Sequence, residues 1–195
     1  MKADVIALQE VDVKVRRTGY VDQPAYLATA LGFHYVFAAS IRYQEGDYGL
    51  AVLSRWPLTQ LQRHRLELAE GRERRIILDV TACVDGRPLR LFHHHADTRP
   101  WARDSGLFEL SKIVAPELGR GVVVLGDFNE GPDGVGVRAL AAAGLKDLVE
   151  THAGPDLSRI DYVFADTALA SGAAGAHVWP TSKSDHHAVV VDLKW

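Results

Sequence analysis

The junction between residues 122–125 (Val-Val-Val-Leu) and residues 126–129 (Gly-Asp-Phe-Asn) restricts the fold more than any other segment of the chain. A short apolar run that ends at a glycine predicts a buried strand. Asp127 and Asn129 are two residues apart, so their side chains project to the same side of an extended chain. Asp and Asn are also common turn residues. If other strands also end in polar residues nearby, Asp127 and Asn129 are suited to hold a water or a metal ion against a phosphoryl group.

Other polar residues border apolar runs in the same way. They are Glu10, His95 and the sequence Ser-Asp-His at 184–186. Because several strand ends on one chain carry such residues, we expect a site at the mouth of a sheet.

Apolar periodicity and turn residues predict eight or so strands with two or three interspersed helices. The predicted helices are 22–31, with Asp22 as cap and Gly32 as stop, 101–118 and 137–143. The predicted strands are 5–8, 35–39, 50–53, 76–84, 89–93, 122–125, 160–164 and 188–193. This alternation is typical of a layered α/β or α+β fold, and we expect residues 1–195 to form one domain.

Composition excludes several classes of protein. The net charge of −3 gives no global attraction to nucleic acid. Cys83 is the only cysteine, so neither an internal disulfide nor a cysteine-rich zinc site can form. No apolar stretch approaches a membrane-spanning length. Because the sequence opens directly on a core-like strand, we expect no signal peptide. The default expectation is therefore a cytoplasmic protein, unless an address signal lies in a missing N-terminus.

Glu10 ends an apolar strand, where an unpaired buried carboxylate would be costly. It is either a helix cap or surface ion pair, or a ligand for a hard cation such as Mg²⁺. His93, His94 and His95 are consecutive, so they cannot all face one way along a strand. A zinc cluster is disfavoured because closed zinc sites take ligands about two to five residues apart together with cysteine. A histidine that stabilises charge near a phosphate fits better.

Asp161 lies inside an otherwise apolar strand. It either accepts hydrogen bonds from backbone amides or orients a histidine and strengthens it as a base. His186 supplies such a histidine. Its neighbour Asp185 projects to the opposite side of an extended chain, so one of the two could face a metal and the other a water.

In these motifs the sequence resembles the endonuclease/exonuclease/phosphatase superfamily, which includes DNase I-like nucleases, sphingomyelinases and inositol-polyphosphate phosphatases. The segments that carry the resemblance are 8–10 (LQE), 48–55 (YGLAVLSR), 95–97 (HAD), 126–129 (GDFN), 160–162 (IDY) and 184–186 (SDH). Their order and spacing are specific, and they span nearly the whole chain. The resemblance implies a DNase I-like α/β fold, a two-sheet sandwich flanked by helices, with the site at one end.

The resemblance also implies a role for each matching residue. Glu10 corresponds to the metal-binding glutamate, and Asp185 to a second acid near the metal. Asp127 and Asn129 correspond to the pair that orients and activates the attacking water. His186 corresponds to the histidine beside the scissile phosphate, and Asp161 to the acid that orients it. His95 corresponds to the histidine that stabilises the phosphate. Arg72 and Arg75 lie where relatives have arginines that contact the phosphate. The two arginines could equally be solvated charges.

One difference from the family concerns the N-terminus. Relatives begin with a strand ending in asparagine and a helix, and here the chain opens where that helix would end. Either the start codon is misassigned, or the fold is N-terminally truncated. A truncated fold would have an exposed sheet edge, through which copies could self-associate, and one ligand fewer near the metal.

The implied function is Mg²⁺-dependent hydrolysis of a phosphoester, with Mn²⁺ or Ca²⁺ as other possible ions. A small-molecule or lipid-derived substrate is favoured over nucleic acid because the chain is mildly acidic and has no basic stripe. The alternatives are a DNase-like nuclease and a truncated, catalytically impaired relative that only binds a partner.

Overall fold

The computed structural model describes residues 3–66, 73–154 and 158–194. The chain divides into two compact units, Met1–His95 and Ala96–Trp195. Each unit mixes strands and helices, which confirms the expected α/β class. That residues 1–195 act as a single domain stays a prediction. Among the described residues, no helix is both long and apolar enough to cross a membrane.

The first unit contains two antiparallel sheets and one α-helix. Its elements are β1 (Val5–Val13), the 3₁₀ turn η1 (Arg16–Thr18), α1 (Gln23–Leu31), β2 (His34–Tyr43), β3 (Gly46–Ser54), β4 (Leu58–Arg65), β5 (Ile76–Val84) and β6 (Arg87–His94). The strand orders are β1-β3-β2 in one sheet and β4-β5-β6 in the other. Strand β3 contacts β5 and β6, and β2 contacts β4, so the two sheets pack against each other.

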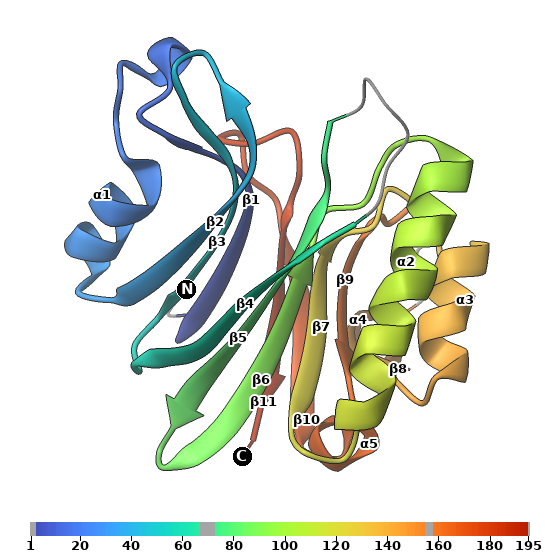
Figure 1. Cartoon of the computed structure of the whole chain (residues 1–195). Helices are drawn as coiled ribbons and strands as arrows, with labels where there is room; N and C mark the ends of the chain where they lie inside the picture. The colour runs from blue at the N-terminus through green and yellow to red at the C-terminus, as the bar shows by residue number, and fades with distance from the viewer. Residues whose placement is uncertain (1–2, 67–72, 155–157, 195) are drawn as a thin grey trace. The chain divides into compact units, whose positions relative to one another are not determined.

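Helix α1 covers the outer face of the β1-β3-β2 sheet (Figure 1). Ala28 of the helix packs with Val11, Ala51 and Leu53 in one buried cluster. Side chains alternate along a strand, so Leu50 and Val52 point to the opposite face, where the second sheet lies. Burial on both faces explains why β3 is a continuous apolar run.

The ends of α1 are those that the sequence predicts. The Asp22 carboxylate accepts a hydrogen bond from the Ala25 N–H, and Pro24 occupies the first turn. Gly32 ends the helix in the left-handed conformation, with φ of 68°, which costs glycine little because it has no Cβ.

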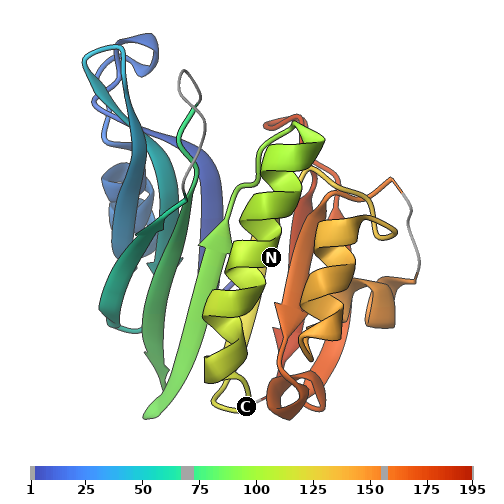
Figure 2. The ribbon, with the colours of Figure 1, turned by 45° about the vertical axis from the view of Figure 1, so that its right-hand side comes forward.

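The second unit contains a sheet of order β7-β9-β8 and a separate β10-β11 hairpin. Its elements are α2 (Pro100–Val114), the 3₁₀ turn η2 (Ala115–Glu117), β7 (Val122–Asp127), α3 (Val135–Ala142), β8 (Lys146–Asp147), α4 (Leu148–Ala153), β9 (Asp161–Ala165), α5 (Thr167–Ala170), β10 (Ala173–Trp179) and β11 (Ala188–Leu193). Figure 2 shows α2 and α3 side by side. Strand β11 contacts β9, and α4 contacts both strands of the hairpin.

Several elements differ from the sequence-based expectation. The predicted helix 101–118 stops at Val114, and a 3₁₀ turn that contains Pro116 follows it. Proline lacks the N–H that a continuing α-helix needs. Strand β4 was not predicted because its sequence, LTQLQRHR, is mostly polar. Strand β10, AAGAHVW, was missed because its first four residues are alanine and glycine, which are depleted in strands.

Candidate active site

Asp127 and Asp161 lie directly opposite each other on two neighbouring antiparallel strands. Asp127 is the last residue of β7 and Asp161 the first of β9, and the two are paired in register. Directly opposite residues project to the same face of a sheet. The backbone pairing therefore brings together two carboxylates that are 34 positions apart in sequence.

His186 lies against both carboxylates. Its Nδ1 is 2.7 Å from Oδ2 of Asp161, and its Nε2 is 3.9 Å from Oδ2 of Asp127. The first distance is that of a charge-assisted hydrogen bond in which Nδ1–H donates to the carboxylate. The second is too long for a hydrogen bond. The hydrogen bond to Asp161 therefore restrains the ring, and Nε2 faces Asp127.

Opposing influences act on the pKa of His186, and the net effect raises it above 6.5. Partial burial, the largest single influence, favours the neutral ring and lowers the pKa. The hydrogen bond to Asp161 and the negative charges of Asp161, Asp127 and Asp185 favour the imidazolium, and together they outweigh burial.

Asp127, Asp161 and His186 could also hold a metal ion. One ligand atom from each lies within 4.8 Å of the other two. The two carboxylates suit a divalent ion such as Mg²⁺ or Mn²⁺, whereas the imidazole suits ions such as Zn²⁺ better. The carboxylates of this group therefore fit the expected cofactor, although the family resemblance implies catalytic roles for these three residues and gives the ion to Glu10 and Asp185.

Asn129 follows β7 in a left-handed conformation, with φ of 49°. Its backbone N–H donates to Oδ1 of Asp127 at 2.8 Å, and its Nδ2 donates to the Ala96 carbonyl at 3.1 Å. The Ala96 N–H in turn donates to the Asp127 carbonyl at 2.8 Å. These bonds hold the predicted acid–amide pair in one local arrangement.

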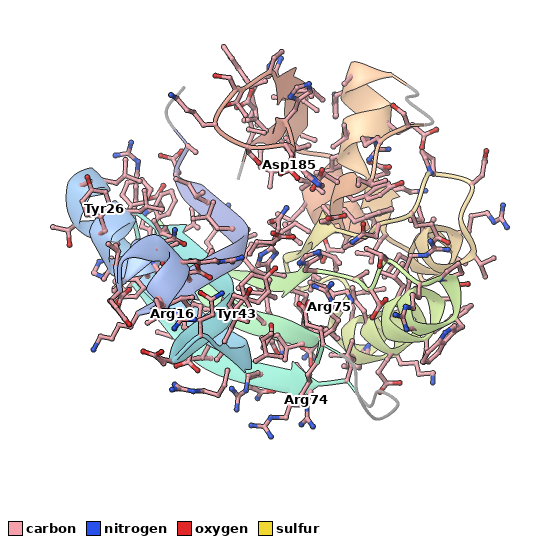
Figure 3. The ribbon with its side chains drawn as sticks, turned by 90° about the horizontal axis from the view of Figure 1, so that it is seen from above. Arg16, Tyr26, Tyr43, Arg74, Arg75 and Asp185 are labelled. Atoms are coloured by element: carbon pink, nitrogen blue, oxygen red, sulfur yellow. The ribbon has the colours of Figure 1, made fainter. Side chains whose placement is uncertain are left out.

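Asp185 lies in the exposed loop between β10 and β11 (Figure 3). The loop turns at Ser184, whose Oγ accepts a hydrogen bond from the His186 N–H at 3.1 Å. The negative charge of Asp185 contributes to the raised pKa of His186. Its predicted role as a metal ligand stays a prediction.

The first unit brings together Glu10, His95 and Arg75. Arg75 Nη1 donates to Nδ1 of His95 at 2.9 Å. An arginine can only donate, so in a neutral His95 ring the proton is on Nε2. That nitrogen is 3.9 Å from Oε1 of Glu10. Arg75 also pairs with Glu73 at 3.1 Å. The other predicted arginine, Arg72, lies outside the described residues.

Glu10 lies in a β-bulge of β1. The register between β1 and β3 shifts between Leu8 and Val11, so two residues of β1 oppose one of β3. Glu10 itself has a φ of 60°, which is strained for a residue with a Cβ. Bulges of this kind re-aim a side chain and are frequent beside functional sites.

Some neighbours of these residues were not assigned a role from the sequence. Tyr48 of β3 has a raised pKa because it is partly buried and lies near the carboxylates of Glu10 and Glu73. Figure 3 shows Arg74 directed away from the first unit, whereas the neighbouring Arg75 points inward. Adjacent side chains of an extended chain project to opposite sides, which is consistent with the different directions of the two arginines.

His93 and His94 are buried within β6, and both have 0% exposure. The Nδ1–H of His94 donates to the Ile76 carbonyl at 2.8 Å. Burial lowers the pKa of His94 to about 4, so the ring is neutral at physiological pH. Both histidines therefore belong to the buried interior of the first unit.

The structure thus gathers the predicted residues into two groups, one within each unit. The first group is Glu10, Arg75 and His95, and the second is Asp127, Asn129, Asp161, Asp185 and His186. Their assigned roles in catalysis, substrate binding and metal binding stay predictions.

A family model described as the Endonuclease/Exonuclease/phosphatase family matches residues 1–186, and the chain belongs to this family. Uncharacterized protein YbhP of Escherichia coli (strain K12) is 26% identical over 191 residues, which cover 88% of this chain and 75% of YbhP.

Solved structures share the fold. Mannosyl-6-phosphatase Bt3783 of Bacteroides thetaiotaomicron has a TM-score of 0.75 and 18% identity, covering 98% of this chain and 85% of that chain. The 3′ phosphatase NExo from Neisseria, bound to a product DNA hairpin, has a TM-score of 0.73 and 19% identity, covering 98% and 89%. These similarities confirm the expected fold class.

Proposed function

We propose that this chain is a divalent-metal-dependent hydrolase of phosphoester bonds, a phosphodiesterase or phosphatase. The observation that carries the proposal is the placement of His186 between Asp161 and Asp127, at 2.7 and 3.9 Å. An oriented histidine beside a carboxylate is suited to proton transfer at a water or at a leaving oxygen. Membership of the Endonuclease/Exonuclease/phosphatase family supports the same reaction class.

Each predicted residue has a distinct chemical task. Asp161 holds Nδ1–H of His186, so Nε2 exchanges the proton. Asp127 positions the attacking water. Nδ2 of Asn129 carries two hydrogens, of which the bond to Ala96 uses one, and the other can donate to a phosphoryl oxygen. No residue need bond covalently to phosphorus, so we expect a single in-line displacement.

In the first unit, Arg75 and His95 can neutralise charge on the phosphoryl oxygens. A bound Mg²⁺ or Mn²⁺ would polarise a phosphoryl oxygen and stabilise the leaving group. Glu10 and Asp185 are the ligands implied by the family resemblance. Asp127, Asp161 and His186 could hold an ion only in place of the proton-transfer roles given above. That both groups of residues act on one phosphate stays a prediction.

We further propose a small-molecule or lipid-derived substrate. The net charge of −3 supports this choice, because tight binding to nucleic acid depends on neutralising many phosphates. A nuclease is the second candidate, since a 3′ phosphatase bound to DNA is among the solved structures that share the fold.

The test is hydrolysis of bis-p-nitrophenyl phosphate and p-nitrophenyl phosphate with Mg²⁺, Mn²⁺ or EDTA, followed by DNA, sphingomyelin and inositol phosphates. We expect turnover with metal and none in EDTA. Asp127→Ala and His186→Ala should each lower kcat by about 10²- to 10⁴-fold.

His177→Ala is the matched control. His177 also pairs with an aspartate, Asp192, at 3.6 Å, but both side chains are exposed on the β10-β11 hairpin. This variant should keep the wild-type kcat. Full activity of either Asp127→Ala or His186→Ala would contradict the assigned roles, and a folded wild-type protein that hydrolyses none of these esters would contradict the function.

A further inference from the structure

A largely buried ion pair between Arg103 and Glu130 contacts the end of the Asp127–Asn129 segment. It has no role in the chemistry described above. Arg103 of α2 and Glu130 of the β7–α3 loop are joined by Nη2 and Oε1 at 3.0 Å, with side-chain exposures of 16% and 5%. Nη1 of Arg103 donates to the Asn129 carbonyl at 3.1 Å. Nε of Arg103 donates to the neighbouring Asp104 at 3.1 Å. A single guanidinium therefore binds both Glu130 and the backbone of Asn129.

Glu130 is itself held on its other side. Its Oε2 accepts a hydrogen bond from the Val137 N–H, in the first turn of α3, at 3.0 Å. The Glu130 carbonyl accepts a hydrogen bond from the buried Tyr162 hydroxyl at 2.8 Å. The carboxylate thus spans from α3 to α2, and the residue after Asn129 is fixed through both its side chain and its backbone.

Two glycines lie so close to Glu130 and Leu107 that a side chain at either position would clash. A Cβ at Gly134 would overlap the side chain of Glu130, and a Cβ at Gly136 would overlap Leu107 of α2 and approach Oε2 of Glu130. Gly134 has a φ of −64°, which any residue can adopt. Glycine is therefore required there by the close approach of Glu130 and not by the backbone conformation.

We propose that Arg103 and Glu130 are positioning residues that hold Asn129 in its left-handed conformation. A positive φ is uncommon for a residue other than glycine, although asparagine adopts it more readily than most, and at Asn129 interactions on both sides favour it. On the C-terminal side of Asn129, the conformation is held by the hydrogen bond from Arg103 and by the contacts of Glu130. On its N-terminal side, it is held by the hydrogen bonds to Asp127 and Ala96.

This inference rests on the proposed function, because positioning matters only if Asn129 contacts the reacting phosphoryl group. The competing interpretation is that the ion pair merely ties α2 to α3. The two interpretations differ in how the effect of Arg103 depends on Asn129. A positioning residue loses its effect once the side chain it positions is gone, whereas a structural tie does not.

The experiment is a double-mutant cycle between Arg103→Met and Asn129→Ala, measured on bis-p-nitrophenyl phosphate with metal. In the wild-type background we expect Arg103→Met to lower kcat by about 10- to 100-fold, the size of effect that follows from a small misplacement. KM should change by less than about 3-fold, and Arg103→Lys should recover part of the loss. In the Asn129→Ala background, Arg103→Met should change kcat by less than about 2-fold. An equal loss of kcat in both backgrounds would overturn the inference.

Arg90→Met is the matched control for lost stability. Arg90 forms two hydrogen bonds to the buried Asp79, at 2.9 and 2.8 Å, within the β5–β6 part of the first unit. Its Tm should fall by an amount similar to that of Arg103→Met while its kcat stays within about 2-fold of wild type. If Arg90→Met lowers kcat as much as Arg103→Met does, the effect is loss of stability and the inference fails.

Amide hydrogen exchange separates this inference from the proposed function. The Asn129 N–H donates to Asp127 in the positioned conformation, so Arg103→Met should accelerate its exchange about 10-fold without substrate or metal. If the wild-type protein hydrolyses no ester but this exchange accelerates, the proposed function fails and the positioning stands. Unchanged exchange in Arg103→Met means that Arg103 does not hold Asn129.

Discussion

His186 has a different environment at each of its ring nitrogens. Nδ1 bonds to Asp161 at 2.7 Å, whereas Nε2 faces Asp127 without a hydrogen bond, at 3.9 Å. The bond to Asp161 fixes the ring orientation and favours the imidazolium, and Asp127 adds only charge. A single substitution at Asp161 therefore tests how much this hydrogen bond contributes to the pKa of His186.

Asp161→Asn keeps the shape of the side chain and removes its charge. We expect the pKa of His186 to fall from its raised value towards or below 6.5, because burial then acts with less opposition. We also expect kcat to fall by at least about 10²-fold. An NMR titration of the metal-free protein measures the pKa. An unchanged pKa would show that Asp161 does not stabilise the imidazolium.

At the scale of elements, strand β6 carries a neutral histidine in its interior. Burial lowers the pKa of His94 to about 4. The hydrogen bond to the Ile76 carbonyl opposes this shift, and electrostatic interactions with Arg75 and His93 add to it, each more weakly than burial. The unfolded chain binds a proton near pH 6.5, and the folded chain does not do so until about pH 4. Stability from this site is thus fully present above pH 6.5 and falls as the pH drops towards 4.

We expect His94 to make the free energy of unfolding fall by up to roughly 3 kcal/mol between pH 6.5 and pH 4. Urea unfolding of the wild-type protein and His94→Leu across this range is the measurement. The variant should be less stable at pH 7, because the Ile76 carbonyl loses its partner, but its stability should depend less on pH. Parallel pH curves for the two proteins would contradict the buried, neutral state.

Asp166 joins the end of β9 to the loop before β7 and to α5. One of its carboxylate oxygens accepts hydrogen bonds from the N–H groups of Gly119, Gly121 and Val122, at 2.9, 3.1 and 3.0 Å. The other accepts from the Leu169 N–H at 3.0 Å. We expect Asp166→Ala to destabilise the protein by at least about 3 kcal/mol, since it leaves buried donors unpaired.

The control for Asp166→Ala is Asp192→Ala, because Asp192 lies exposed on β11. Its effect on the free energy of unfolding should be within about 0.5 kcal/mol. Thermal or urea unfolding measures both variants. A loss for Asp166→Ala no larger than that for Asp192→Ala would show that the carboxylate does not organise this end of the second unit.

At the scale of the whole molecule, metal binding should appear as a gain in stability. An ion that binds only the folded chain stabilises it by about 2.7 kcal/mol at 100 times its Kd. We expect Mg²⁺ or Mn²⁺ to raise the Tm of the EDTA-treated protein. Asp127→Asn tests whether the ion binds at Asp127, Asp161 and His186. Glu10→Gln tests whether it binds at Glu10, the ligand that the family resemblance implies.

The rise in Tm should disappear in whichever variant removes a ligand and persist in His177→Ala. If the rise persists in Asp127→Asn but not in Glu10→Gln, the ion binds as the family resemblance implies. An equal rise in wild type and both variants would mean that the measured ion does not depend on either carboxylate.

Much of the fold and of the site could be predicted from the chain itself. The apolar run before Gly126 and the caps of α1 are local signals, because hydrophobic period and capping depend on neighbouring residues. The polar strand β4 escaped prediction, because its place in a sheet depends on pairing with distant residues. Arg72 lies outside the described residues, so its predicted role is untested.

The sequence alone determined the family, since the types and order of the motif residues along the chain mark it, and it predicted which residues carry the chemistry. Only the tertiary structure decided what each of them touches. The register of β7 against β9 placed Asp127 opposite Asp161, the bulge in β1 displayed Glu10, and packing of α2 against α3 brought Arg103 to Glu130. These contacts join residues far apart in sequence, and the free energy of burying the surrounding core selects them, which no local pattern encodes.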